Sequence, residues 1–278
     1  MKHVYALLKR HPALLIGGGL LLLIVCVAIF APWLGTVDPT AVSPINRTKL
    51  PSEQFWFGTD MLGRDVYSRV IYGSRVSLIV GFSVAFLSVV IGVVVALIAG
   101  FVRTADAIIM RIVDGLMSIP HILLAIALIA VSGSSITNVI VALTIAEIPQ
   151  VVRLERGMVL SLREMPYVEA AIASGAGLWR IVGRHIFPNT VAALLVQATY
   201  ICSVAILLEA SLSFIGAGVP PTTPSWGNIM AEGRTLWQIR PNLIAFPAIF
   251  LSLTVLAVNM LGDSLSDLAN PRANKGGK

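Results

Sequence analysis

The chain has 278 residues, of which 56% are hydrophobic and only 12% are charged. A soluble domain carries about a quarter charged residues, so the composition excludes a soluble globular protein. The net charge of +6 would suggest nucleic-acid binding in a soluble chain. Here the basic residues lie in loops between apolar segments, as they do in membrane proteins. We therefore expect an all-α, polytopic membrane protein whose surroundings are a lipid bilayer, with no nucleic-acid partner.

The first apolar segment runs from Ala13 to Leu34 and follows a short basic start. As a helix it would be about 33 Å long, which is enough to cross a bilayer. A cleaved signal peptide is the alternative, but the segment ends without an A-x-A site. We interpret it as a retained first span whose N-terminus lies in the cytoplasm.

The polar, proline-containing stretch 35–75 is predicted to be an external loop. Within the third predicted span, at about 107–131, Arg111 and Asp114 can pair on one helix face, and Pro120 is expected to kink the helix. The remaining five spans are predicted at about 78–101, 107–131, 136–152, 191–215 and 243–261. These six transmembrane helices divide the chain into a tail, first helix and external loop (1–75), a five-helix core (76–265) and a cytoplasmic tail (266–278).

The longest polar interruption in the second part of the chain lies at about 153–190. Glu169 falls in the first turn of a predicted short helix, where the helix dipole favours a carboxylate. Small residues follow, and Gly175 allows the chain to reverse. Pro188 is best tolerated in a first helical turn, so it is expected to open the next helix. The pattern predicts a helix-turn-helix between two membrane spans.

The segment Glu169-Ala170-Ala171, together with Gly175 and the sequence His185-Ile186-Phe187-Pro188, resembles the EAA loop of ABC-importer permeases. His185 and Phe187 replace the more common Ile and Leu. The resemblance implies a cytoplasmic coupling loop that docks on an ATP-hydrolysing subunit. An ordinary amphipathic connector is the alternative. The coupling residues that the resemblance implies are Glu169, Ala170, Ala171, Gly175, Phe187 and Pro188.

A second pattern, GTD-x-x-GRD-x-x-SR, precedes the second predicted span. Its mixed charges suggest an interfacial helix with ion pairs at the membrane surface. The pattern is similar to that of the dipeptide/oligopeptide/nickel subgroup of the same permeases, and so is the later stretch SFIGAGVPPTTPSWGNIM. The residues of this external motif are Gly58, Asp60, Gly63, Arg64, Asp65 and Arg69.

The distribution of positive charge predicts the orientation. With the N-terminus inside, thirteen of the 20 Lys and Arg residues fall in predicted cytoplasmic segments and seven in external ones. This bias obeys the positive-inside rule. We expect a multi-pass protein of the bacterial cytoplasmic (inner) membrane, with both termini and the 153–190 loop in the cytoplasm.

The chain has no phosphate-binding loop, no nucleophile beside a base, and no metal-ligand spacing of Cys or His. We expect no catalytic residues, no metal site and no cofactor of its own. Glu147 and Glu209 lie inside predicted spans, where a charged group costs roughly 2.5–3.5 kcal/mol. Both are candidates for lining a translocation pathway. The alternative is a structural hydrogen bond, or, for Glu147, a position at the membrane interface.

The resemblance implies a permease subunit of a type I ABC importer that moves di- or oligopeptides by alternating access. Its implied partners are a sister permease in a heterodimer, two ATP-binding subunits that hold ATP and Mg, and an extracytoplasmic solute-binding protein. Nickel chelates, glutathione or another small solute are alternative substrates of the same importer type. An autonomous ion-driven transporter and a non-transporting scaffold are alternatives from other classes.

Overall fold

The computed structural model describes residues 12–269, in which every regular element is a helix. The longer helices are α2 (Pro12–Ile29), α3 (Val66–Phe101), α4 (Arg103–Met117), α5 (His121–Ser132), α6 (Ile136–Arg163), α9 (Phe187–Phe214) and α11 (Asn242–Ala269). The shorter elements are η1 (Ala31–Trp33), η2 (Pro44–Asn46), α7 (Pro166–Ala173), α8 (Leu178–Ile181), the π-helical turn η3 (Val182–Ile186), α10 (Trp226–Gly233) and η4 (Arg234–Leu236).

Five helical segments are long and apolar enough to cross a membrane: α2, α3, α6, the continuous stretch 178–214 and α11. Helices α4 and α5 pass the same test together, with a bend of 93° between them. The predicted all-α fold is confirmed, and six spans result when this bent pair counts as one.

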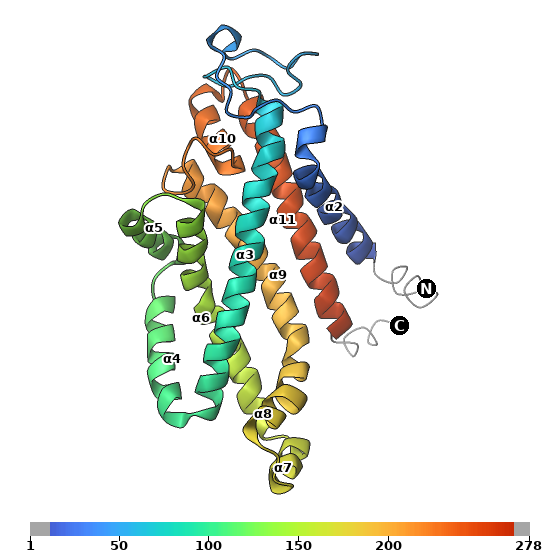
Figure 1. Ribbon diagram of the computed structural model, residues 1–278, viewed down its shortest axis with the longest axis vertical. Helices are drawn as coiled ribbons and strands as arrows, with labels where there is room; N and C mark the ends of the chain where they lie inside the picture. The colour runs from blue at the N-terminus through green and yellow to red at the C-terminus, as the bar shows by residue number, and fades with distance from the viewer. Residues whose placement is uncertain (1–11, 270–278) are drawn as a thin grey trace.

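Helix α3 runs through the middle of the molecule and contacts helices on both flanks (Figure 1). Helices α2 and α11 pack together on one flank, and α4, α5 and α6 lie on the other. The loop before α3 and helix α10 form one end of the molecule, whereas α7 and α8 form the opposite end. The external motif and the predicted coupling loop therefore lie far apart.

Close packing of α3 against α6 holds the centre together. A Cβ atom on Gly92 would lie 2.6 Å from Cβ of Val151, and one on Gly100 would lie 2.5 Å from Cγ1 of Val159. Small residues let membrane helices approach this closely. The two backbones are therefore in near contact along the lower half of α3.

The helix that carries the second span begins earlier than the predicted span. Helix α3 starts at Val66, because Asp65 caps it by accepting a hydrogen bond from the Ser68 amide at 2.8 Å. The helix therefore includes the last part of the stretch predicted as an external loop, and the predicted region boundary at 75 falls inside α3. At 36 residues, α3 is about 54 Å long, so it extends beyond the hydrocarbon layer of a bilayer, which is about 30 Å thick.

Other predicted boundaries also move. Pro120 precedes α5 and separates it from α4, so the third span is broken and not merely kinked. Asp114 pairs with Arg153 at 2.6 Å, and the predicted pair with Arg111 is wrong. Helix α6 continues beyond the predicted end at 152, and the region boundary at 265 falls inside α11. The predicted cytoplasmic termini, at 1–11 and 270–278, lie outside the described residues.

Two glycine-to-alanine substitutions test the packing of α3. Gly92→Ala should lower the thermal midpoint of the solubilised protein, because its methyl group overlaps Val151 and overpacking costs about 1–3 kcal/mol. Gly115→Ala in α4 is the matched control, since a Cβ there meets nothing within 4 Å. It should raise the midpoint, because Ala favours a helix over Gly by roughly 0.5–1 kcal/mol. Equal shifts of the two midpoints would contradict this account.

Candidate coupling site and external ion-pair cluster

Helices α7 and α8 form a helix-turn-helix, which we call the coupling tip (residues 166–181). Gly175 ends α7 with φ +79°, a conformation that favours glycine. The Gly175 amide donates to the Ile172 carbonyl at 2.9 Å, and the Ala176 amide donates to the Ala171 carbonyl at 3.0 Å. This pair of bonds is the Schellman arrangement that closes a helix C-terminus. The predicted reversal at Gly175 and the predicted position of Glu169 in the first turn of α7 are confirmed.

The inner side of the coupling tip is anchored to the core. Val168, Ile181 and Ile186 are buried together with Val159 of α6. At the base of the tip, the Arg163 guanidinium donates a hydrogen bond to the carbonyl of Gly100 at the end of α3. These contacts hold the coupling tip against the lower ends of α3 and α6.

The outer side of the coupling tip is apolar and exposed. The Trp179 side chain is 87% exposed and Ile172 is 54% exposed. The acidic Glu169 and the small Ala170 lie exposed beside them, whereas Ala171 is half-buried. Exposed apolar side chains on a short helix-turn-helix at one end of the molecule mark an interaction surface. The other large exposed apolar side chains of the tip and its entry are Met165, Tyr167 and Leu178.

A π-helical turn joins the coupling tip to α9. Phe187 begins α9 and Pro188 lies in its first turn, as predicted. Phe187 also lines an apolar groove of 450 Å³ between α3 and α9. Three residues further on, the Thr190 hydroxyl donates to Oε1 of Glu155 in α6 at 3.0 Å. Glu155 is fully buried, and the sequence patterns did not single it out.

The external motif forms a buried ion-pair cluster at the opposite end of the molecule. Oδ2 of Asp60 accepts from Nε of Arg64 at 2.7 Å and from Nη1 of Arg69 at 2.5 Å. Glu232 of α10 accepts from Nη2 of Arg64 at 2.6 Å and from Nη2 of Arg69 at 3.0 Å. The predicted charge pairing is confirmed, and the helix that carries Arg69 is the first part of α3, continuous with the second span. Sequence reasoning missed Glu232, which lies 163 residues from Arg69.

The glycines of the external motif permit tight turns. Gly63 has φ +73°, and a Cβ there would lie 1.9 Å from the Ser43 carbonyl oxygen. Gly58 has φ +79°, and its Cβ would lie 2.6 Å from the Lys49 carbonyl oxygen. The turns bring Asp60 and Arg64 under the folded external loop. The motif therefore ties the loop, α3 and α10 into one unit.

The two carboxylates predicted to line a pathway lie in the packed interior. Glu209 has no exposed surface, and it accepts hydrogen bonds from the hydroxyls of Ser77 at 3.0 Å and Ser213 at 2.9 Å. Glu147 is also fully buried, with its Oε1 3.0 Å from Nδ1 of His121. These contacts fit the structural alternative for each residue. Their role in a pathway stays a prediction.

Comparison with known families agrees with this architecture. Residues 77–275 match the model of the family described as "binding-protein-dependent transport system inner membrane component". Residues 2–51 match the model of the "N-terminal TM domain of oligopeptide transport permease C". The chain therefore belongs to the family of binding-protein-dependent inner-membrane transport components.

Individual relatives share most of their length with this chain. A "probable peptide ABC transporter permease protein" of Sinorhizobium fredii is 52% identical, over 98% of this chain and 93% of the relative. A "glutathione transport system permease protein" of Pectobacterium atrosepticum is 40% identical, over 95% of this chain and 88% of the relative. The fold resembles a structure of the MetNI methionine ABC transporter in an inward-facing conformation. That match has a TM-score of 0.57 and 22% identity, and it covers 72% of this chain and 95% of the other.

Neutralising Glu232 should weaken the external ion-pair cluster. Glu232→Gln leaves two buried guanidinium groups with Asp60 as their one anionic partner among residues 12–269. We expect a loss of about 1–3 kcal/mol in stability, below the 3–5 kcal/mol typical of a fully buried pair, because the Glu232 side chain is 26% exposed. The readout is the thermal midpoint of the solubilised protein. The control Glu53→Gln, in an exposed part of the loop, should leave it unchanged. Equal midpoints for both variants would show that the cluster contributes no stability.

Proposed function

We propose that this chain is the membrane-spanning subunit of an ATP-driven importer that moves small peptides by alternating access. Membership of the binding-protein-dependent family supports the importer class. The relative from Sinorhizobium fredii supports a peptide substrate. In this proposal the chain pairs with a sister permease in a heterodimer and receives its substrate from an extracytoplasmic solute-binding protein.

The coupling tip is the feature on which the proposal rests. It combines an exposed apolar surface around Trp179 with a buried anchor on α3 and α6. Such a surface needs a partner, and the anchor lets a push on the tip reach the membrane helices. We assign Glu169, Ala170 and Ala171 to contact with an ATP-binding subunit. Gly175 shapes the turn, and Phe187 and Pro188 join the tip to α9.

The chain itself supplies no site for ATP chemistry in this proposal. The two ATP-binding subunits hold ATP and Mg, and this chain converts their motion into a change of access to the substrate path. Glu147 and Glu209 are candidates to meet substrate in a conformation that exposes them.

The proposed orientation follows from the two ends of the molecule. Five arginines lie in the lower part of α6 and in the coupling tip and its junction with α9: Arg153, Arg156, Arg163, Arg180 and Arg184. Positive residues gather on the cytoplasmic side of membrane proteins. The coupling tip then lies in the cytoplasm, and the external ion-pair cluster faces the solute-binding protein outside a bacterial inner membrane.

Glutathione is a second candidate substrate, favoured by the relative from Pectobacterium atrosepticum. Glutathione is a tripeptide, so the two candidates share backbone amides and terminal charges. Uptake of labelled dipeptides and of labelled glutathione by the same cells, with and without the gene, separates them.

Co-purification tests the subunit assignment. Tagged protein extracted in detergent from its native cells should bring down an ATPase and a second permease. Glu169→Arg should weaken the recovery of the ATPase while leaving the second permease bound, because Glu169 is exposed on the coupling tip, away from the membrane helices. Wild-type protein that purifies alone and transports substrate in liposomes without ATP would overturn the proposal in favour of an autonomous carrier.

The turn of the coupling tip offers a sharper test. Gly175→Pro should leave membrane insertion intact but abolish substrate uptake, because proline fixes φ near −65° and cannot adopt the observed +79°. It also removes the amide that donates to Ile172. The matched variant Gly175→Asn should retain most uptake, since asparagine tolerates the left-handed conformation. Normal uptake by the proline variant would refute the role of this turn.

A further inference from the structure

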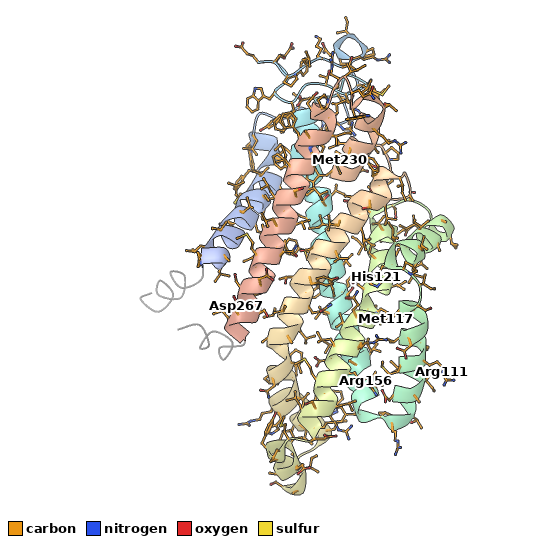
Figure 2. All side chains as sticks on the ribbon, turned by 180° about the vertical axis from the view of Figure 1, so that it is seen from behind. Arg111, Met117, His121, Arg156, Met230 and Asp267 are labelled. Carbon is orange, nitrogen blue, oxygen red and sulfur yellow. The ribbon has the colours of Figure 1, made fainter. Side chains whose placement is uncertain are left out.

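Helix α6 holds α4 on one side of the break in the third span. Arg156 forms an ion pair with Asp106, and Arg153 forms one with Asp114 at 2.6 Å. Both acids belong to α4, which ends at Met117. Figure 2 shows Arg156 on the part of α6 nearer the coupling tip, with Met117 and His121 on the two sides of the break. Helix α4 and the lower part of α6 are thus joined by two ion pairs, the second of them exposed, and by a buried apolar cluster that includes Val113 and Val152.

Across the break, the same helix holds the start of α5. His121 is the first residue of α5, and its Nδ1 lies 3.0 Å from Oε1 of Glu147. The His121 side chain is 27% exposed, whereas Glu147 has no exposed surface. His121 therefore lies partly at the surface and contacts the fully buried carboxylate of Glu147, just after a 93° bend in the chain.

Only one of the two carboxylate oxygens of Glu147 has a hydrogen-bond partner among the described residues. Oε2 of Glu147 is buried and has no hydrogen-bond partner among the described residues. Pro149 follows two residues later, inside α6, and has no amide to donate to the Ile145 carbonyl. An unpartnered buried carboxylate oxygen is unfavourable. Glu209, by contrast, has both oxygens bonded, to Ser77 and Ser213. Glu155, further along α6, also has one buried oxygen without a partner among the described residues.

The lower part of α6 is also fastened to the coupling tip and its exit. Glu155 accepts a hydrogen bond from Thr190 in the first turn of α9. After Arg163, α6 leads into α7 through only two residues. A displacement of the coupling tip therefore acts directly on α6, and α6 carries α4 with it.

We propose that His121 and Glu147 form the positioning contact that sets the angle between α4 and α5 in response to the coupling tip. This inference rests on the proposed function, because it needs a partner that moves the tip. Helix α4 and the lower part of α6 move as one body. The His121–Glu147 contact holds α5 to that body in the observed conformation and opens when the body moves. Neither residue needs to touch substrate.

Thermal stability and coupling, measured on the same variant, separate this role from a purely structural one. Glu147→Leu removes a buried oxygen that has no partner, so the assembled complex should keep its thermal midpoint. Uptake should nevertheless lose its link to ATP hydrolysis. If the contact were merely structural, the midpoint, uptake and ATP hydrolysis would instead fall together.

The test uses the full importer reconstituted in liposomes, with wild type and variants Glu147→Leu, His121→Leu and the double variant. The measured quantity is substrate transported per ATP hydrolysed. Each single variant should lower it about fivefold, the population change that corresponds to one typical hydrogen bond. The double variant should fall no further, because both substitutions remove the same contact. Glu147→Gln keeps an oxygen that can accept from His121 and should retain most of the coupling.

Thr144→Val is the matched control. Thr144 lies one turn earlier on α6, is buried, and its hydroxyl also has no partner among the described residues. Its removal should leave transport per ATP unchanged. Wild-type coupling in both leucine variants, or additive losses in the double variant, would overturn the inference while leaving the proposed function intact. Wild-type liposomes that show no ATP-dependent uptake would instead refute the proposed function itself. If Glu147→Leu fails to assemble, the result for His121→Leu decides, because that side chain is partly exposed.

Discussion

The structure depends on one constraint: polar groups inside an apolar helical bundle must find their partners within the protein. Glu209 meets it with serine hydroxyls from its own helix and from α3. Arg75 meets it by donating to the carbonyls of Ala28 and Ile29, where α2 ends. In the external ion-pair cluster, two arginines meet two acids. Each solution joins helices that are far apart in the chain, so satisfying polar groups also determines which helices are neighbours.

The two ends of the molecule differ in which side chains they bury and which they expose. At the external end, charges are buried and paired, and Trp226 of α10 donates from its indole nitrogen to the Val70 carbonyl of α3 at 3.0 Å. The result is a closed cap of loop and short helices. At the opposite end, the coupling tip exposes its apolar side chains and buries only its inner face. The same set of helices therefore carries a closed cap at one end and an exposed apolar surface at the other.

Helix α6 links the packed core to the end of the molecule that carries the coupling tip. Its upper half packs in the core, and its lower half carries the charged residues that hold α4 and the start of α9. The break between α4 and α5 lies beside the only part of α6 that contains a proline. Backbone and side-chain hydrogen bonds are therefore incomplete at the same level of the bundle. This is the level at which we propose that the angle between α4 and α5 changes.

The sequence by itself determined the membrane class, the number of spans and the position of the coupling tip. These follow from local signals: long apolar runs, a carboxylate in a first helical turn, Gly175 at a reversal and Pro188 at a helix start. The same local rules did not predict that α3 begins at Val66 as one continuous helix or that α6 extends to Arg163, because charged residues such as Arg69 and Arg156 were assigned to polar segments outside the spans. Only the tertiary structure supplies the acids that allow them to stay helical. The tertiary structure alone also determined which distant residues are partners. Glu232, in a helix near the other end of the chain, contacts Arg64. His121 contacts Glu147 just after the chain bends by 93° between α4 and α5. Local patterns encode helices and turns through backbone propensity and hydrophobic periodicity, whereas contacts between distant residues depend on how those helices pack, which no local pattern specifies.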